Sequence, residues 1–417
     1  MTEGTDPAAA PAGVMDGAVD PVTPPEAPLP RSPRVRRREM ALAAAWLALP
    51  AILWAVDYSR HRYNNFLIFR HVFWHLVERR DLYALYPAQF GDVNLYGPVF
   101  GLVVAPFAML PEGVGGLLWS LAMAALLWAA VSRLRLPPER RLLALLLILP
   151  ELLTAVHSSQ FNPAVAALPL LTLADVEEGR DLRAPLWSLL GAFVKLYSAV
   201  GLVLVLFSRR PRRFLLGCAL WSALLLVAPM ALAGPEYVLE SYQGWYAALA
   251  RKNALNLQVG GDISLVGLVR RAFGMPLPLT GSAAAGLALA LAPLLRRAQY
   301  PHRRFRHLAL ASLLLFLVLF SSGSENPTYV VAATGAVLWL VHRPDPPGRW
   351  GWWLVAAMVL VALGPTHLLS VPLARFFNHY ALKAVLYGVM WVLLSRDLLW
   401  RDFREPPEGA PLEVRSC

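Results

Sequence analysis

The chain has 417 residues, of which 57% are hydrophobic and only 16% are charged, with a mean hydropathy of +0.49 and a formal net charge of +11. Soluble domains have about 45–50% apolar and about 25% charged residues, so this composition excludes an ordinary soluble protein and indicates surface that faces lipid. The positive charge does not predict a nucleic-acid partner, because the arginines gather in short loops between apolar runs and no nucleic-acid-binding motif accompanies them.

The first 30 residues are rich in proline, alanine and acidic residues and contain no lysine or arginine. Such a segment cannot bury enough apolar surface to order itself, so we predict that it is disordered. Five arginines at positions 31–38 directly precede the apolar run 40–56, which favours a cytoplasmic N-terminus. The predicted division is a cytoplasmic tail at 1–39 with this basic cluster, a polytopic transmembrane domain at 40–399 and a cytoplasmic tail at 400–417.

Apolar runs along the chain predict an all-α membrane protein with about twelve transmembrane helices and both termini in the cytoplasm. Several runs are shorter than the roughly 20 residues that a perpendicular helix needs, and others contain proline, glycine or polar residues. Broken helices are tolerated where protein or a water-filled cavity covers the free backbone groups, so the pattern indicates a transporter or a membrane enzyme. The runs are 40–56, 98–110, 114–131, 142–156, 163–174, 185–207, 214–233, 279–295, 308–321, 329–341, 351–366 and 380–395.

The loop charges test this topology. Twelve spans place the basic loops 208–213 and 296–307 in the cytoplasm, as expected. The arginines of segment 133–141 would instead lie outside. The conflict disappears if 98–131 acts as one bent span and Lys195 marks a compensating break inside 185–207.

Two long loops, 57–97 and 234–278, are then predicted to lie outside. Each carries apolar residues at spacings of three and four, which predict amphipathic helices lying in the membrane interface. These stripes are Phe66, Phe69, Phe73 and Leu76 in the first loop, and Val238, Tyr242, Trp245 and Leu249 in the second.

Polar residues that interrupt or end the apolar runs are the candidate functional residues. Asp57 follows the first span, where a carboxylate can act as a general base and nearby cations can hold a phosphate; an interfacial acid among headgroup anchors explains it equally well. Lys195 lies in the middle of a run, where an ionisable group is costly and function is the default hypothesis, although a lysine can also snorkel to the interface. The candidate substrate-binding residues are Arg60, His61, Arg62, Asn64, Asn65, His157, Gln160, Asn162, Lys195, Tyr197, Glu325, Asn326 and Tyr329.

Several common motifs are absent from the sequence. There is no Walker loop, dinucleotide fingerprint, nucleophile elbow or HExxH motif. No Asp-x-Asp occurs, so the metal and nucleotide-sugar site common in soluble glycosyltransferases is not indicated. The two cysteines, Cys218 and Cys417, have no metal-ligand spacing.

The order of these landmarks resembles glycosyltransferase family 87, whose members are polyprenyl-phosphate-sugar-dependent membrane enzymes of the GT-C fold. The resemblance covers about 40–399, and the order and spacing of its pieces make it specific. The pieces are Asp57, Asn64-Asn65-Phe-Leu-Ile-Phe, Asp81-Leu-Tyr83-Ala-Leu-Tyr86-Pro87, Tyr96-Gly97-Pro98, Leu110-Pro111, Gln160-Phe-Asn162-Pro163, Phe193-Val-Lys195-Leu-Tyr197, Ser264-Leu, Glu325-Asn326-Pro-Thr-Tyr329 and Tyr380–Trp391.

The resemblance implies an inverting hexosyltransferase, often a mannosyltransferase, that acts on the extracytoplasmic side of the cell membrane. The donor would be a polyprenyl-phosphate sugar, the acceptor a glycan or glycolipid, and Asp57 the general base; no metal or other cofactor is required. Ser198, where the family often has proline, and Gly97-Pro98, where many members have two prolines, depart from the family pattern around the donor pocket.

Two other functions remain open from the residues alone. A transporter or flippase of lipid-linked sugars would also have broken helices and buried polar residues, but the internal repeats that would favour it are not evident. A non-catalytic scaffold of an envelope assembly would tolerate substitution of Asp57 and Lys195.

Overall fold

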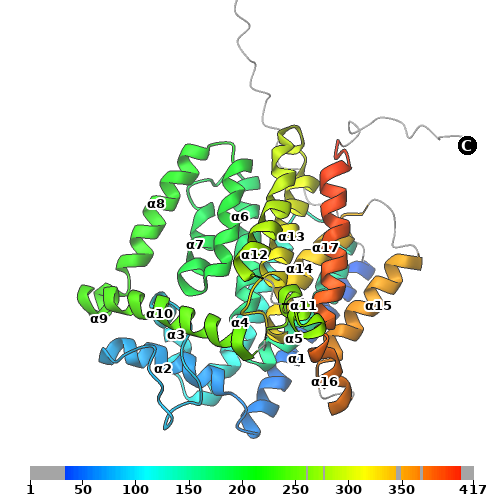
Figure 1. The fold of residues 1–417 in the computed structure, drawn as a ribbon. Helices are drawn as coiled ribbons and strands as arrows, with labels where there is room; N and C mark the ends of the chain where they lie inside the picture. The colour runs from blue at the N-terminus through cyan, green and yellow to red at the C-terminus, as the bar shows by residue number, and fades with distance from the viewer. Residues whose placement is uncertain (1–32, 260–261, 276–277, 344–348, 367–369, 405–417) are drawn as a thin grey trace, which may run out of the picture.

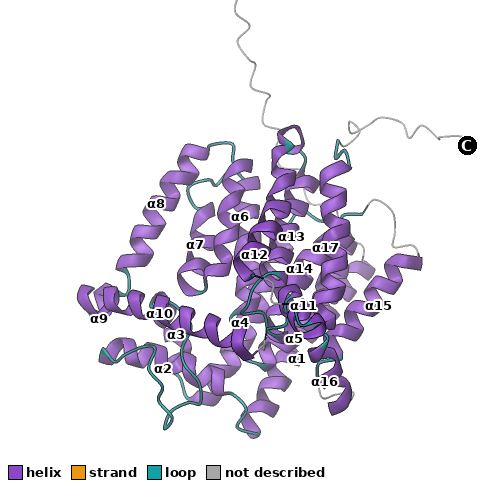
Figure 2. Cartoon of the chain, in the orientation of Figure 1, coloured by secondary structure: helices purple, strands orange, loops and turns teal. Residues whose placement is uncertain are grey.

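The computed structural model describes residues 33–259, 262–275, 278–343, 349–366 and 370–404 (Figure 1). Within these ranges every regular element is a helix and no strand occurs (Figure 2), which confirms the all-α class. The predicted disordered segment 1–30 lies outside the described residues, as does most of the predicted C-terminal tail. The basic cluster that precedes the first apolar run belongs largely to the first helix, which begins at Pro33.

The elements, in chain order, are α1 (Pro33–Ser59), α2 (Asn64–Glu78), α3 (Val99–Ala108), α4 (Glu112–Arg133), α5 (Pro138–His157), α6 (Asn162–Glu177), α7 (Ala184–Val194), η1 (Leu196–Phe207), α8 (Pro211–Val227), α9 (Met230–Ala233), α10 (Pro235–Val259), α11 (Leu265–Phe273), α12 (Leu279–Leu291), η2 (Ala292–Leu295), η3 (Arg297–Gln299), α13 (Arg303–Leu319), η4 (Asn326–Thr328), α14 (Tyr329–Val341), α15 (Arg349–Leu363), α16 (Val371–His379) and α17 (Leu382–Trp400), where η denotes a 3₁₀ helix.

Contacts between distant segments define the two ends of the bundle. At one end of the bundle, which we call the basic end, Arg141 at the start of α5 pairs with Glu39 at the start of α1 at 3.0 Å. Arg296 donates there to the backbone carbonyls of Leu398 and Arg401, where α17 ends. The described parts of both chain ends therefore lie at the basic end. The opposite end, which carries α2, α3, α9, α10 and α16, is called the cavity end.

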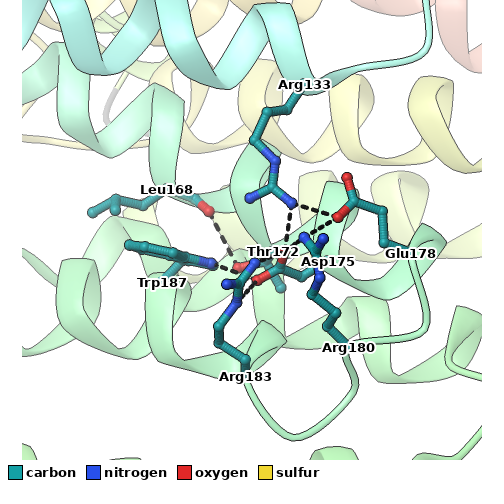
Figure 3. Close-up of polar contacts among 8 residues, drawn as sticks. All are labelled: Arg133, Leu168, Thr172, Asp175, Glu178, Arg180, Arg183 and Trp187. Carbon is teal, nitrogen blue, oxygen red and sulfur yellow. Dashed lines mark hydrogen bonds and ion pairs between the residues drawn. The ribbon is translucent and has the colours of Figure 1, made fainter.

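A charged cluster joins the α4–α5 and α6–α7 turns at the basic end (Figure 3). The side chain of Asp175 is fully buried and accepts hydrogen bonds from Arg133 at 2.7 Å, from both Nε and Nη2 of Arg183, and from the indole of Trp187 at 2.8 Å. Glu178 pairs with Arg133 at 2.7 Å and also with Arg180. The two turns therefore lie at the same end, with the buried carboxylate compensated by several donors.

Helix α3 begins and ends at the cavity end and does not run through the bundle. Just before α3, the backbone N–H of Gly97 donates to Val194 O at 3.0 Å. Just after α3, Leu110 O accepts a hydrogen bond of 2.7 Å from Arg70 of α2. Only α4 then returns to the basic end, which places the arginines of segment 133–141 there. Segment 98–131 therefore passes through the bundle once, but in α4 alone: α3 does not form the first half of the predicted bent span, and 98–110 is not a separate run.

The apolar run 185–207 is a hairpin of two helices, because Lys195 adopts an extended conformation between α7 and η1. Ser208 follows η1 and donates a hydrogen bond of 2.5 Å to Asp181, which precedes α7. The start of α7 and the end of η1 therefore both lie at the basic end. Two glycines allow this close packing: a Cβ on Gly191 would lie 2.3 Å from Ser198 Oγ, and one on Gly201 would lie 2.0 Å from Ser188 Oγ. The run 185–207 is therefore broken at Lys195, at the position predicted from the arginines of segment 133–141.

The described segments that run between the two ends are α1, α4, α5, α6, α7, η1, α8, α12, α13, α14, α15 and α17. Three helical stretches in the described part of the chain are long and apolar enough to cross a bilayer by themselves: Pro33–Ser59, Glu112–Arg133 and Pro211–Ala233. The other runs are shorter or carry charged residues, and they pack within the bundle. The count of twelve transmembrane helices stays a prediction, with η1 in place of 98–110.

The two predicted outer-loop helices exist as α2 and α10, but their apolar stripes face protein. Phe66, Phe69 and Leu76 are buried, and Phe69 makes edge-on ring contacts with Tyr96 and Trp119 at centroid distances of 5.0 and 5.6 Å. On α10, the buried Trp245 donates to Leu95 O at 2.9 Å. The stripes pack inward because the loop 79–97 and α3 lie over them. The stripes therefore contact protein, and the position of the two helices in the membrane interface stays a prediction.

Candidate active site

A cavity of about 330 Å³, which we call the lysine cavity, opens where α10, the hairpin tip and the starts of α6 and η4 meet. It brings together six of the predicted site residues: Asn65, Gln160, Asn162, Lys195, Tyr197 and Glu325. The other residues around it are Ile68, Phe69, Asp92, Val93, Leu95, Tyr96, Leu196, Trp245, Leu249, Lys252, Asn253, Asn256, Ser321, Ser322, Gly323 and Thr328. Its wall combines an apolar part with carboxamides, two lysines and two carboxylates.

Lys195 projects from the hairpin tip into this cavity. Its ammonium donates to Asn162 Oδ1 at 2.8 Å and lies 5.8 and 5.3 Å from the ring centroids of Tyr96 and Tyr197. The phenol of Tyr197 shares a hydrogen bond of 2.5 Å with Ser321 Oγ. Since an ammonium has three protons and the described contacts use one, Lys195 retains the capacity to bind an anion.

The turn between α5 and α6 places Gln160 and Asn162 in the cavity. Helix α5 ends at His157. Ser159, two residues later, has a positive φ of 50°, and Gln160 N bonds back to Ala155 O at 3.0 Å. This backbone pattern ends a helix sharply and reverses the chain. Asn162 and Pro163 start α6 directly afterwards, as a proline in the first turn favours.

Tyr96 connects the long 79–97 loop to this turn. Its hydroxyl donates to Gln160 Oε1 at 2.9 Å, and burial raises the pKa of Tyr96, with the nearby charge of Glu325 acting in the same direction. The phenol therefore stays protonated and fixes the amide of Gln160. Gly97 is required beside it, because a Cβ there would lie 2.1 Å from the backbone oxygen of Phe193.

One face of α10 forms much of the cavity, and the sequence interpretation missed most of it. Trp245, Leu249, Lys252, Asn253 and Asn256 all line the cavity at helical spacing. Asn256 donates to Ser322 O at 2.9 Å, and Asn253 accepts a hydrogen bond from the Ser322 hydroxyl. The sequence did contain a pattern that could have identified this face. Lys252, Asn253 and Asn256 continue the predicted stripe by two helical turns, with polar side chains in place of apolar ones.

The distribution of lysine distinguishes this cavity from the rest of the chain. The sequence contains three lysines against 35 arginines. Lys195 and Lys252 both line the cavity, while Lys383 is buried in the bundle in an ion pair with Glu151 at 2.7 Å. Lysine is a compact point charge and a common phosphate ligand, so two of the three lie where a phosphate could be bound.

A second cavity of about 630 Å³, which we call the polar cavity, adjoins the first and shares Glu325 with it. Its other lining residues are Ser158, Ile263, Arg271, Asn326, Pro327, Asn378 and His379. Asn326 Nδ2 donates to Asn378 Oδ1 at 2.9 Å, while the buried Oδ1 of Asn326 has no hydrogen-bond partner among the described residues. Six of the eight lining residues carry amide, hydroxyl, imidazole or charged side chains, and Ile263 and Pro327 are the apolar ones.

Asp57 lines neither cavity. It lies in the last turn of α1, is 2% exposed, and accepts a hydrogen bond from His157 Nδ1 at 2.7 Å, with Arg62 3.4 Å from its other oxygen. The side chain of His157 is 46% exposed. Ser158, the next residue, lines the polar cavity, and its carbonyl accepts from Asn65 of the lysine cavity at 2.7 Å. Neither Asp57 nor His157 lines a cavity, but His157 directly precedes Ser158 of the polar cavity and is the more exposed member of the pair.

The remaining predicted site residues lie outside both cavities. Arg60 and His61 are exposed on the turn after α1, and Asn64 accepts from Gly91 N at 2.7 Å and so fixes the 79–97 loop. Tyr329 is fully buried at the start of α14, where its hydroxyl donates to Ile263 O and its ring lies 5.4 Å from the ammonium of Lys383. Tyr329 therefore supports the bundle.

Comparison with known proteins gives one family. The model of Glycosyltransferase family 87 matches residues 94–322, which is more than half of the chain and includes the lysine cavity's α6, α7 and α10. No curated protein and no solved structure matches the chain. The matched segment carries Tyr96, Gln160, Asn162, Lys195 and Tyr197, the residues that meet around one cavity at the end of an apolar helical bundle. The chain belongs to glycosyltransferase family 87, and it is a membrane glycosyltransferase.

Proposed function

We propose that this protein transfers a hexose, specifically mannose, from a polyprenyl-phosphate donor to a glycan or glycolipid acceptor with inversion at the anomeric carbon. The observation that carries this proposal is the lysine cavity, in which two of the chain's three lysines lie among carboxamides and beside apolar side chains. A donor of this class has a phosphate, a sugar and a lipid, and the cavity offers a partner for each.

The donor would bind with its phosphate at Lys195 and its sugar against the amides of Asn162, Gln160 and Asn256. Leu196, Leu249 and Trp245 would contact the first isoprene units. As the bond to the sugar breaks, negative charge grows on the departing phosphate, and a fixed ammonium stabilises that charge most strongly in the transition state. No step in this displacement needs a nucleotide.

The acceptor would enter through the polar cavity. Six of its eight lining residues offer amide, hydroxyl, imidazole or charged groups that can form hydrogen bonds with a hydroxylated acceptor. Glu325 lies where the two cavities meet, so an acceptor hydroxyl near it would face the donor sugar. Removal of the hydroxyl proton depends on Asp57, which resemblance to the family implies as the base and which lies beside this junction through His157 and Ser158.

The proposal also includes the orientation of the protein in the membrane. The clusters 133–141, 209–213 and 296–306 all belong to the basic end, which the positive-inside rule assigns to the cytoplasm. The cavities would then face the extracytoplasmic side of the cell membrane. Twelve crossings in a GT-C type bundle, with α7 and η1 as two short ones, return both chain ends to the same side.

Cysteine labelling tests this topology. In a variant with Cys218 and Cys417 replaced, single cysteines would be introduced at three exposed positions: Asp92, Arg135 and Pro301. We expect an impermeant maleimide to label position 92 in intact cells, and positions 135 and 301 only after permeabilisation. Labelling of position 135 in intact cells would mean that α3 crosses the membrane, and labelling of 301 without 92 would reverse the orientation.

A transfer assay tests the function. The purified full-length protein in lipid vesicles would be given radiolabelled polyprenyl-phosphate mannose, glucose or galactose together with octyl mannoside and other glycoside acceptors. We expect mannose to move to an acceptor, polyprenyl phosphate to be released, and the anomeric configuration to invert. Transfer from a nucleotide sugar alone would refute the donor, and passage of the intact lipid-linked sugar across the vesicle bilayer without bond cleavage would favour a transporter.

A further inference from the structure

The hydrogen bond between Asp57 and His157 joins residues a hundred positions apart and brings together the ends of α1 and α5. The two side chains differ in exposure. The Asp57 side chain is 3% exposed, whereas the His157 side chain is 46% exposed. An acceptor hydroxyl can therefore reach the imidazole but cannot reach the carboxylate without displacing protein.

The geometry also fixes the role of each imidazole nitrogen. An ionised carboxylate only accepts hydrogen bonds, so Nδ1 of His157, at 2.7 Å from Asp57 Oδ2, must carry a proton. In the neutral imidazole the proton-free nitrogen is then Nε2, which makes no hydrogen bond within the described residues. A carboxylate on one nitrogen and a free lone pair on the other is the arrangement in which an aspartate orients a histidine base and stabilises it once it is charged.

The pair lies beside the junction of the two cavities. Ser158 follows His157 directly and lines the polar cavity, and Asn65, which lines the lysine cavity, holds the Ser158 carbonyl at 2.7 Å. Arg62 lies 3.4 Å from Asp57 Oδ1 and forms an ion pair with it. His157 therefore lies next to a residue of the polar cavity, through which the proposed acceptor would enter, and its imidazole is partly exposed.

From this geometry we infer that His157 is the catalytic residue that receives the acceptor proton and that Asp57 is a positioning residue acting through it. As the acceptor oxygen forms its bond to the anomeric carbon, its proton passes to His157 Nε2. The bond from the anomeric carbon to the phosphate oxygen breaks, and its electron pair leaves with the polyprenyl phosphate. The imidazolium, held by Asp57, then returns the proton to solvent. This inference rests on the proposed glycosyl transfer.

Two amide substitutions separate the two roles of His157. In His157→Asn, the side-chain NH₂ can occupy the position of Nδ1 and still donate to Asp57, but the proton-accepting nitrogen is lost. If His157 receives the proton, kcat for transfer from polyprenyl-phosphate mannose to octyl mannoside should fall about 10²-fold, with KM for the donor little changed. If His157 served only to hold Asp57, His157→Asn should retain most of the turnover.

Chemical rescue gives a readout that a structural role would not produce. His157→Gly should lose turnover to a similar extent and regain part of it when imidazole is added, because the site is partly open to solvent. His302→Asn, a histidine at the basic end far from both cavities, is the matched control and should respond neither to substitution nor to imidazole. Thermal unfolding of each variant, in lipid, checks that the fold is retained.

A double substitution completes the test. Residues that act as one unit lose their effect together, so adding His157→Asn to Asp57→Asn should lower kcat little further. The inference is overturned if wild-type protein transfers mannose while His157→Asn keeps more than half its turnover, or if imidazole fails to rescue a folded His157→Gly. Failure of the wild-type protein to transfer any hexose would contradict the proposed function itself, and this inference with it.

Discussion

Asp57→Asn should lower the turnover of hexose transfer by about 10²-fold or more while the affinity for the donor changes little. The substitution keeps the size and shape of the side chain and removes its negative charge. Without that charge, the imidazole that Asp57 contacts at 2.7 Å loses both its orientation and the partner that stabilises its protonated form. Asp57 lines neither cavity, so the binding surface for the donor stays intact. The measurement is kcat and donor Kd on the purified variant in lipid.

Three other carboxylates provide the comparison. Asp92 and Glu325 line the lysine cavity, and Asp81 lies in the same long loop as Asp92 and accepts from Tyr83 N at 2.8 Å. If Asp57→Asn turns over at a near-normal rate, Asp57 leaves the mechanism, and Glu325→Gln, at the junction of the cavities, becomes the variant of interest. Because Asp57 is buried, the variant's unfolding temperature must be measured as well, so that a loss of fold is not mistaken for a loss of catalysis.

Lys195→Leu should weaken donor binding by roughly 10- to 100-fold and abolish measurable turnover, whereas Lys195→Arg should retain part of both. A hydrogen bond to a charged group contributes about 1.5–3 kcal/mol, which sets the size of the loss in affinity. Turnover falls further because the charge on the departing phosphate is largest in the transition state. Arginine keeps the charge, but its planar fork does not reproduce the contact of the ammonium with Asn162.

Polyprenol, which has the lipid but lacks the phosphate, is the control ligand for Lys195. Quenching of Trp245, which lines the lysine cavity, would report its binding, provided that the signal disappears in a Trp245→Phe variant. We expect Lys195→Leu to bind polyprenol as the wild type does and to bind polyprenyl phosphate much less tightly. If Lys195→Leu keeps full turnover and full affinity for polyprenyl phosphate, Lys195 does not bind the donor and has only a structural role between α7 and η1.

The sequence by itself determined the class of this protein. The excess of apolar residues requires lipid as a solvent, and the all-α class, most of the helical runs and the helices of both long loops followed from periodicity. Spacing along the chain also determined the family, because the landmarks resembling glycosyltransferase family 87 keep their order whatever the fold, and the family match over residues 94–322 confirmed it.

The arginines of segment 133–141 showed that a simple count of apolar runs conflicts with the positive-inside rule in this part of the chain. Only the tertiary structure showed which runs pass through the bundle and which do not. An apolar run such as 185–207 can be one crossing or two packed helices, and its hydropathy is the same in both cases. The difference lies in Gly191 and Gly201, which let α7 and η1 approach closely, and in Arg70 and Gly97, which hold both ends of α3 at the cavity end. These contacts join residues that are far apart in the sequence, so no local pattern contains them.

The candidate site shows the same limit. The sequence identified Asn65, Gln160, Asn162, Lys195, Tyr197 and Glu325 as polar interruptions, and these six meet in one cavity. It could not show that α10 completes the wall, nor that Asp57 is buried behind His157. Burial and pairing depend on which helix ends meet in space, and the ends of α1 and α5 meet only because the bundle packs them side by side.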